Sequence, residues 1–297
     1  MTRHGFISLF AAALSVPAFA ASARPPLRVV SQTVLTDEVL LAIADAGQIA
    51  ALSHLSRDPR FCADAERARA FLRLPRDTGV EAVLKLCPDL VLFADFSRPE
   101  LTAQLRRSGA EVWFFGRYDT LEETYAGMLR LAKRLGSGAL VRAESVIADC
   151  RRRAAALEKR LRDVKPVRVF APSTYEIVPG DKTNFQDYCD RAGAENIAKT
   201  FGGLTGHCPA PNERILGWPV EKVVVTGEVA GGGDALPDRT DVERALRPFR
   251  RLQPYRHLAA VREGRAAVLK PWQISCVSHH RTLCCEYLAR QLHPEVF

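Results

Sequence analysis

Short apolar runs alternate with amphipathic stretches from residue 28 onward, and this alternation predicts strands and helices in turn. In the first half of the chain we expect buried strands at 28–31, 49–52, 90–93 and 111–115. The helix after the first strand is predicted to have Thr36 as its N-cap and Gly47 as its stop signal. Further helices are expected at 79–86 and 99–108. Strands joined by helices in this way form a mostly parallel sheet that is covered on both faces.

A long helical stretch from 121 to 162 divides the chain, with a break at Gly136-Ser137-Gly138. The part after the break would be about 36 Å long. The alternation then restarts, with strands expected at 167–170, 220–226 and 266–269, helices at 184–192, 241–251 and 282–292, and a loop at 172–183. We therefore predict an α/β fold of two lobes joined by a single long helix, with a ligand cleft between the lobes. The predicted boundaries are 24–137 for the first lobe, 138–165 for the linking helix and 166–297 for the second lobe.

Residues 1–23 have the pattern of a secretory signal peptide. Arg3 and His4 give a short positive start, an uncharged apolar stretch follows, and Ala18-Phe19-Ala20 fits a cleavage site, with a second at Ala21-Ser22-Ala23. An uncleaved membrane anchor is the alternative interpretation. We expect cleavage, and hence a mature protein exported to the periplasm.

The distribution of charged residues argues against a nucleic-acid binder but does not by itself favour another function. The 42 Lys and Arg against 34 Asp and Glu give a net charge of +8, but the arginines are spread among acidic residues. A nucleic-acid binder would show a basic stripe with aromatic residues, so no nucleic-acid partner is expected. The sequence also has no P-loop, nucleophile elbow or H-E-x-x-H motif. An exported two-lobed chain without such motifs points to binding rather than to an enzyme.

Several segments in order along the chain carry a resemblance to a known family. They are Arg28–Ser31 with Thr36-Asp37-Glu38, Ile49–His54, Gly79–Leu92, Ala192–Ala198, His257–Arg265 and Leu292–Phe297. Together they resemble the periplasmic substrate-binding proteins of ABC importers, in the class that carries ferric siderophores, haem and vitamin B12. The resemblance covers roughly residues 27–297. It implies two Rossmann-like lobes bridged by one long helix that allows little hinge motion.

The resemblance also implies partners. In this family one glutamate on each lobe contacts arginines of the ABC permease in the membrane, and the positions that match are Glu81 and Glu213. The protein is expected to act as a monomer and to hold no permanent cofactor. Its ligand would be a small metal chelate: a ferric siderophore, haem or a corrinoid.

Residues at the predicted strand ends are the candidates for ligand contact. They are Ser31, Thr33, His54, Phe96, Arg117, Ser173, Thr174, Tyr175, His207, Trp272 and Arg281. Arg117 and Arg281 could pair with carboxylates or a phosphate of the ligand. Tyr175 and the histidines are candidate axial ligands if the ligand is haem. Because these candidates are polar and basic, a ferric siderophore is favoured among the chelates.

Eight cysteines are scattered along the chain without a C-x-x-C pair. In an exported protein they can form disulfides. We expect one bond between Cys189 and either Cys284 or Cys285. The stretch from Cys276 to Cys285 also contains two histidines. The alternative function is therefore an exported metal-binding protein or metal-dependent enzyme that uses this Cys/His cluster.

Overall fold

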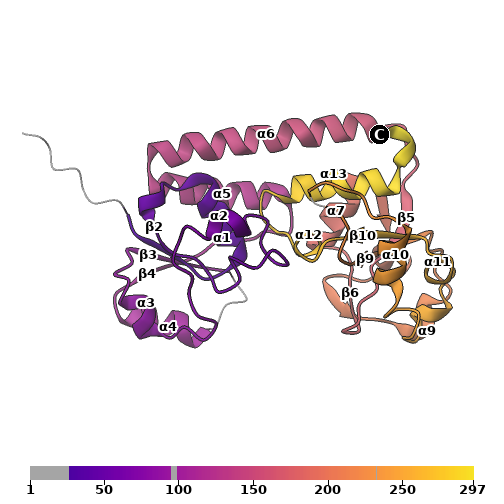
Figure 1. Cartoon of the computed structure of the whole chain (residues 1–297), viewed down its shortest axis with the longest axis horizontal. Coiled ribbons are helices and arrows are strands. Elements are labelled where there is room, and N and C mark those ends of the chain that lie inside the picture. The colour runs from indigo at the N-terminus through magenta and orange to yellow at the C-terminus, as the bar shows by residue number, and fades with distance from the viewer. Residues whose placement is uncertain (1–26, 95–98, 232) are drawn as a thin grey trace, which may run out of the picture.

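The computed structural model of the chain describes residues 27–94, 99–231 and 233–297. It has two α/β lobes side by side, with one long helix running along the top of both (Figure 1). The predicted signal peptide and Phe96 lie outside the described residues. No helix in the described part of the chain is both long and apolar enough to cross a membrane.

The N-terminal lobe contains a parallel four-stranded sheet in the order β2-β1-β3-β4. Its strands are β1 (Val29–Ser31), β2 (Ile49–Ala51), β3 (Leu90–Phe93) and β4 (Glu111–Phe114). Its helices are α1 (Val34–Ile43), α2 (Ala65–Ala68), α3 (Val80–Leu84), α4 (Pro99–Arg107) and α5 (Leu121–Leu135). The alternation of strands and helices predicted for this half is confirmed.

Both faces of this sheet are buried, which explains why β3 is apolar throughout and β1 begins with two valines. Val29, Leu90 and Leu92 face a core made with α1, α5 and the long helix. Val30 and Val91 face the opposite core, made with α3 and α4. Successive strand residues therefore point to different cores.

The C-terminal lobe repeats this plan, with a parallel sheet in the order β10-β9-β5-β7. Its strands are β5 (Val167–Phe170), β7 (Ala194–Asn196), β9 (Lys222–Thr226) and β10 (Ala266–Leu269). Its helices are α7 (Asn184–Ala192), α8 (Ile197–Thr200), α9 (Asn212–Ile215), α10 (Arg239–Leu246), α11 (Ala259–Arg262), α12 (Pro271–Ile274) and α13 (Arg281–Leu292). In each lobe the first strand lies between the second and the third, so the two sheets share one topology.

The long helix α6 (Ser137–Leu161) is part of both lobes. Gly136, with φ of +124°, ends α5 and lets the chain reverse into α6. Ala143 and Ile147 belong to the N-terminal core, whereas Leu157 belongs to the C-terminal core. The helix thus links the two lobes, as the sequence pattern predicted.

Several local predictions differ from the structure, and the helix expected at 241–251 is α10 at Arg239–Leu246. Thr33, not Thr36, caps α1, because its hydroxyl accepts the Thr36 backbone N–H at 3.4 Å. The helix ends at Ile43 and a short 3₁₀ turn (Ala46–Gln48) follows, so Gly47 does not end it. The predicted loop at 172–183 contains a strand, β6 (Ile177–Pro179), which pairs with β8 (His207–Pro209).

Candidate functional site: an interlobe cleft

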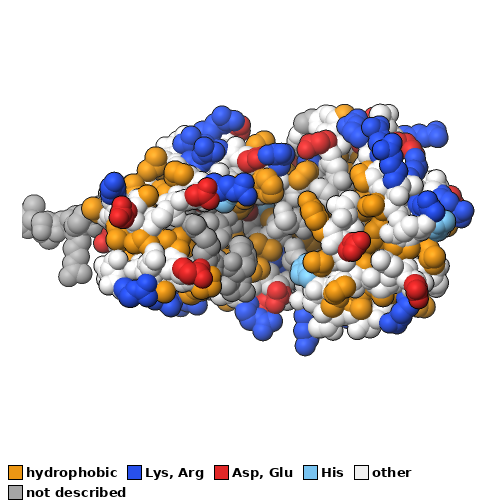
Figure 2. All heavy atoms as spheres, turned by 90° about the horizontal axis from the view of Figure 1, so that it is seen from below, with side chains coloured by type: hydrophobic (Ala, Val, Ile, Leu, Met, Phe, Trp, Pro, Cys, Tyr) orange, Lys and Arg blue, Asp and Glu red, His pale blue; other side chains and the backbone are white. Residues whose placement is uncertain are grey.

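Three adjoining depressions lie along the junction of the lobes. The N-terminal depression has a volume of about 230 Å³, the central one about 400 Å³ and the C-terminal one about 420 Å³. Ser275 and Val277 line both the N-terminal and the central depression. Asn184, His207 and Ile274 line both the central and the C-terminal one. Together they form one cleft, and from below the surface is hollowed between the lobes with hydrophobic side chains on both sides (Figure 2).

The topology explains why the cleft is here. In open α/β sheets, ligands bind beyond the carboxyl ends of the strands, where the strand order reverses. Gln32 and Thr33 follow β1, and Ser53 to Leu55 follow β2. On the other side, Ala171 to Tyr175 follow β5, and Thr226 ends β9. The carboxyl ends of both sheets therefore line the same cleft.

Two buried carboxyl groups of α1 lie beneath the N-terminal depression. Asp37 accepts the Ser53 backbone N–H at 2.9 Å, and Glu38, which lines the depression, accepts that of Ala63 at 2.7 Å. Burial raises the pKa of Asp37 to about 6. Burial, aided by the nearby Cys276, raises the pKa of Glu38 to about 8. Glu38 is therefore mostly protonated at neutral pH and adds little negative charge to this end of the cleft, whereas Asp37 is mostly ionised there.

Apolar side chains dominate the rims of the cleft. Phe61 is 42% exposed beside the N-terminal depression, and Tyr175 is 86% exposed beside the C-terminal one. Ile177, also exposed, extends the second rim along β6. Aromatic and aliphatic groups on two facing rims suit a ligand with flat apolar faces.

Six predicted contact residues line the cleft: Thr33, His54, Ser173, Thr174, Tyr175 and His207. Ser31, Arg117, Trp272 and Arg281 line none of the three depressions. Ser31 is fully buried and bonds the Thr36 hydroxyl at 2.6 Å, so it supports the loop that carries Thr33. Trp272 packs against the C-terminal core.

The two predicted ligand-pairing arginines have other partners. Arg117 is exposed and forms ion pairs with Asp119 at 3.0 Å and Glu123 at 2.8 Å. Arg281 is fully buried and forms an ion pair with Asp187 at 2.9 Å. Neither arginine lines the three depressions, so the two arginines give no support for a siderophore over the other chelates.

Arg281 instead helps to join the lobes. Its guanidinium donates to the backbone oxygens of Tyr118 and Asp119 in the N-terminal lobe and of Cys276 in the C-terminal lobe. A charged group at 0% exposure is stable only because its donors are satisfied in this way. Arg281 is thus a structural residue of the junction.

Arg281 belongs to residues 276–282, which we call the interlobe segment. The Thr124 hydroxyl donates to the Val277 carbonyl at 3.0 Å, and the Tyr125 and Thr282 hydroxyls are 3.3 Å apart. The His280 ring lies 2.8 Å from the Asp64 carboxylate. The interlobe segment is therefore a second connection between the lobes, in addition to α6.

The Cys/His cluster does not assemble into a metal centre. Among the described residues, no group of three or more His, Cys, Asp or Glu side chains is placed to hold a metal ion. His280 pairs with Asp64, whereas Cys284 and Cys285 are buried in the C-terminal core. Burial lowers the pKa of His279 to about 3 and keeps its ring neutral. The alternative function based on this cluster is therefore not favoured.

All eight cysteines lie in the described residues and all are free thiols, so the expected disulfide from Cys189 is absent from the structure. Cys189 and Cys285 are neighbours in the C-terminal core. Cys284 belongs to the same core, and its thiol donates to the His280 carbonyl at 3.4 Å.

Sequence reasoning missed several lining residues. They are Val34, Leu35, Phe61, Ile177, Lys182, Asn184, Phe249, Ile274, Ser275 and Val277. Ile274 to Val277 could have been anticipated, since they follow β10 as the other lining residues follow their strands. Phe61 and Lys182 lie in loops without periodic pattern, and only the folded chain brings them to the cleft.

The two glutamates expected to contact a permease are exposed on separate lobes. Glu81 lies in the first turn of α3 and Glu213 in the first turn of α9. Helices α3 and α9 are at the lower edges of the two lobes, on the side opposite α6 (Figure 1). One flat partner could therefore reach both helices at once.

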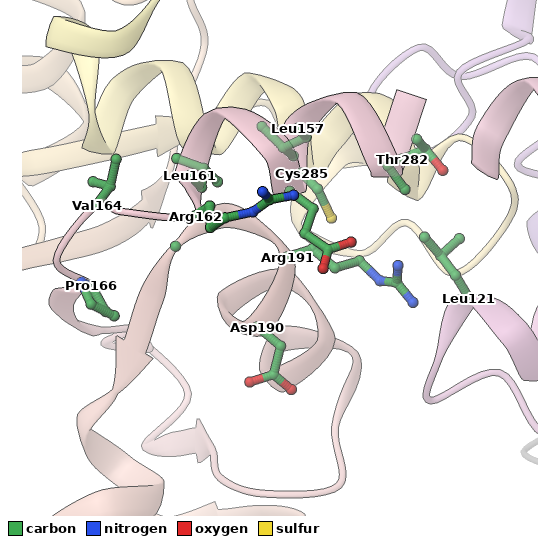
Figure 3. A pocket seen from close by; sticks show the side chains of 13 residues that line it. Leu121, Leu157, Leu161, Arg162, Val164, Pro166, Asp190, Arg191, Thr282 and Cys285 are labelled. Atoms are coloured by element: carbon green, nitrogen blue, oxygen red, sulfur yellow. The ribbon is translucent and has the colours of Figure 1, made fainter. Parts of the chain in front are cut away.

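A further cavity of about 560 Å³ lies under α6, away from the cleft. Its walls come from α6, α7 and α13, and Figure 3 shows Leu157, Leu161 and the Cys285 sulfur beside the Arg162 and Arg191 side chains. Arg191 is held by an ion pair with Asp187 at 2.8 Å. This cavity shares no lining residue with the three depressions.

Comparison with known proteins identifies the family. A family model described as periplasmic binding protein matches residues 29–271, which is most of the chain and includes both sheets. The chain belongs to the periplasmic binding protein family. This family consists of binding proteins and acts outside the cytoplasm.

Individual relatives agree with this family. A cobalamin-binding protein of Halobacterium salinarum is 29% identical over 163 residues, which are 54% of this chain and 43% of that protein. The chain thus spans less than half the length of the curated relatives it matches. The structure is similar to the periplasmic haem-binding protein RhuT from Roseiflexus, with a TM-score of 0.70 and 19% identity over 92% of this chain and 100% of that one. It is also similar to the vitamin B12 binding protein BtuF of Vibrio cholerae, with a TM-score of 0.68 and 18% identity. That similarity covers 91% of this chain and 98% of the BtuF chain. These likenesses confirm the two-lobed fold.

Proposed function

We propose that this protein captures a metal chelate in the interlobe cleft outside the cytoplasm and delivers it, as a monomer, to an ABC importer. The observation that carries the proposal is the convergence of both sheets' carboxyl ends on one cleft with apolar rims. A binding protein needs such a cleft and no catalytic group. The family match and the names of the relatives support the same function.

Within the chelates, we favour a flat macrocycle, haem or a corrinoid, over a siderophore. Phe61 and Tyr175 on opposite rims suit the two faces of such a ring. Lys182 in the central depression can pair with an acidic side group of the ligand. His54, His207 and Tyr175 line the cleft and are candidate axial ligands for a haem iron.

Delivery would use Glu81 and Glu213. Both are exposed, one on each lobe, and their helices share the lower side of the molecule (Figure 1). A permease with arginines at the matching spacing could hold both lobes during release. Two connections between the lobes, α6 and the interlobe segment, imply that the cleft closes only slightly on its ligand.

The ligand site is tested by equilibrium titration with haemin and with cyanocobalamin, measured by absorbance. We expect wild-type protein to bind one of them at one molecule per chain. Phe61→Ala and Tyr175→Ala should each raise the Kd about tenfold, because each removes an aromatic face worth ~1.4 kcal/mol.

Arg117→Ala is the matched control. Arg117 is exposed, lines none of the three depressions and forms surface ion pairs with Asp119 and Glu123, so its loss should change the Kd less than twofold. Equal effects of the three substitutions would contradict the assignment of the cleft. Binding that none of them changes would contradict it as well.

A further inference from the structure

An ion pair joins the interlobe segment to the N-terminal lobe. The Nε2 atom of the His280 ring lies 2.8 Å from one carboxylate oxygen of Asp64, and both side chains are mostly buried. Arg67 holds the other oxygen of this carboxylate at 3.1 Å and donates to the Leu41 carbonyl at 2.6 Å. Asp64 is therefore fixed to α1 and α2, so the ion pair ties His280 to the body of the N-terminal lobe.

A short series of contacts connects His280 to the wall of the cleft. Its backbone N–H donates to the Ser278 hydroxyl at 3.3 Å, and this hydroxyl lies 3.5 Å from the Cys276 sulfur. Cys276 and Val277 line the N-terminal depression, and Val277 lines the central one as well. An interaction that holds His280 in place therefore also holds this wall of the cleft.

Of the contacts described between the interlobe segment and the N-terminal lobe, that of His280 depends on pH near neutrality. The Val277 carbonyl and the Thr282 hydroxyl do not ionise there, and the Arg281 guanidinium keeps its charge. The strength of this second connection between the lobes therefore varies with the protonation of His280.

The ion pair favours the charged forms of both partners. Burial and the charge of Arg67 act to lower the pKa of His280, but the hydrogen bond to Asp64 and the negative charges nearby raise it above the usual 6.5. Burial acts to raise the pKa of Asp64, but its contacts with His280 and Arg67 lower it below the usual 3.8. At neutral pH an imidazolium therefore faces a carboxylate.

The ionisable groups from α1, α13 and the interlobe segment leave this charge state in place. Glu38 is mostly protonated at neutral pH, and its ionisation near pH 8 would favour the protonated ring of His280 further. The His279 ring lies against that of His280, with 4.1 Å between centroids, and stays neutral because burial lowers its pKa to about 3. Burial raises the pKa of Cys284, so this thiol is neutral too.

Solvent reaches His280 through a depression of about 310 Å³ between α6 and the interlobe segment. Asp149, Cys150 and Arg153 of α6 line this depression together with His280. Asp149 and Arg153 form an ion pair at 3.2 Å and largely offset each other, and burial raises the pKa of Cys150, which stays a neutral thiol. A proton can therefore reach or leave the His280 ring without unfolding of the lobes.

We infer that His280 and Asp64 form a proton-dependent lock, which positions the interlobe segment at the cleft and loosens when His280 loses its proton. A group whose pKa is raised by folding stabilises the folded arrangement below its unfolded pKa and loses this effect as the pH rises through the folded value. The lock is thus complete between about pH 4 and pH 6.5 and weakens above this range. The affinity of the cleft should weaken with it; this effect on the ligand rests on the proposed function, whereas the lock itself does not.

Asp64→Asn tests the lock without a ligand, because asparagine keeps the shape of the side chain and removes its charge. Amide hydrogen exchange of the mature chain is measured by mass on peptides that cover residues 276–282, at pH 6 and pH 8.5. Comparing variant and wild type at the same pH cancels the intrinsic exchange rate. We expect these amides to exchange at least about fivefold faster in the variant at pH 6, and within about twofold of wild type at pH 8.5. Equal exchange at pH 6 would overturn the inference.

A titration of wild type needs no folded variant. The pKa of His280 is followed by NMR of its ring protons, assigned through the neighbouring residues of the chain. We expect a pKa above the usual 6.5, because the neighbouring carboxylate favours the protonated ring. A pKa at or below 6.5 would overturn the inference.

The effect on the cleft is measured by absorbance titration with haemin and with cyanocobalamin at the same two pH values. For the compound that wild type binds, Asp64→Asn should raise the Kd at least about fivefold at pH 6 and less than about twofold at pH 8.5. The same difference is expected when Asp64→Asn is made in Glu38→Gln, which excludes the ionisation of Glu38 as its cause. An unchanged Kd at pH 6 would overturn the link between the lock and the cleft.

Asp45→Asn is the matched control. Asp45 is also an aspartate of the N-terminal lobe in a long-range ion pair, with Arg142 of α6 at 2.7 Å, but it is exposed and lines none of the three depressions. Its loss should leave the Kd unchanged at both pH values. Should wild type bind neither compound, the proposed function is contradicted, whereas the exchange and NMR results still support or overturn the lock.

Discussion

Replacing Glu38 by Gln tests the claim that the floor of the cleft is dry enough to keep a carboxylic acid protonated. Glu38 is 3% exposed, and its nearest backbone donor is the Ala63 N–H at 2.7 Å. Glutamine has the same shape and retains an oxygen to accept that bond. The substitution therefore removes the ionisation of the side chain with little change in packing.

The size of the effect follows from linkage. The pKa of Glu38 is about 8 in the folded protein, against 4.5 for a free glutamate. Between these values the unfolded chain has lost the proton that the folded protein still holds, so the stability of wild type falls as pH rises. The two pKa values give a loss of about 3 kcal/mol between pH 5 and pH 8, at no more than about 1.4 kcal/mol per pH unit. The free energy of unfolding of Glu38→Gln should not show this fall, because glutamine does not ionise.

The assay is urea unfolding at 25 °C across this pH range, with a reductant present to keep the thiols reduced. We expect the free energy of unfolding of Glu38→Gln, relative to wild type, to increase by about 3 kcal/mol from pH 5 to pH 8. Glu81→Gln, on an exposed turn of α3, is the control and should stay parallel to wild type. Parallel curves for Glu38→Gln as well would refute the reasoning, because Glu38 would then be ionised in the folded protein.

Two further predictions concern the junction and the surface. Arg281→Met should lower the free energy of unfolding by about 3–5 kcal/mol, because the buried Tyr118 and Asp119 carbonyls lose their donor and Asp187 keeps only its ion pair with Arg191. Arg107→Met, on an exposed face of α4, should change it by less than 0.5 kcal/mol in the same urea assay. Charge reversal at both Glu81 and Glu213 should abolish uptake of the ligand by cells while the Kd measured on the purified protein stays unchanged, and normal uptake by this double variant would disprove the docking role.

Periodicity was enough to predict the architecture. Strands β3 and β5 and helix α7 begin and end where the sequence pattern indicated. Buried β3 is apolar throughout, β5 alternates apolar residues with Arg168, and Gly193 in the left-handed conformation ends α7. The start of α1 was misplaced, because Thr33 and Thr36 are both suitable caps. The backbone bond to the Thr33 hydroxyl decides between them.

Most of the correctly predicted lining residues come shortly after a strand, as Thr33, His54 and Ser173 do, whereas His207 begins β8. The roles of the arginines could not be predicted, because a guanidinium can form an ion pair either with a bound ligand or with a carboxylate that is distant in the sequence. Arg281 finds Asp187, which lies 94 residues away in sequence, and this pairing depends on the packing of α7 against α13. No sequence pattern around Phe61 indicates that it lies at the cleft, because tertiary contacts set its place on the rim.

The central claim is that the cleft captures a metal chelate, and the melting temperature of residues 24–297 with a ligand panel tests it most directly. The panel contains haemin, cyanocobalamin, several ferric siderophores and bare divalent metal ions. A ligand at 100 times its Kd should add about 2.7 kcal/mol, or roughly 5–10 °C. We predict this shift with haemin or cyanocobalamin. No shift with any chelate, together with a shift by a bare metal ion, would contradict the claim.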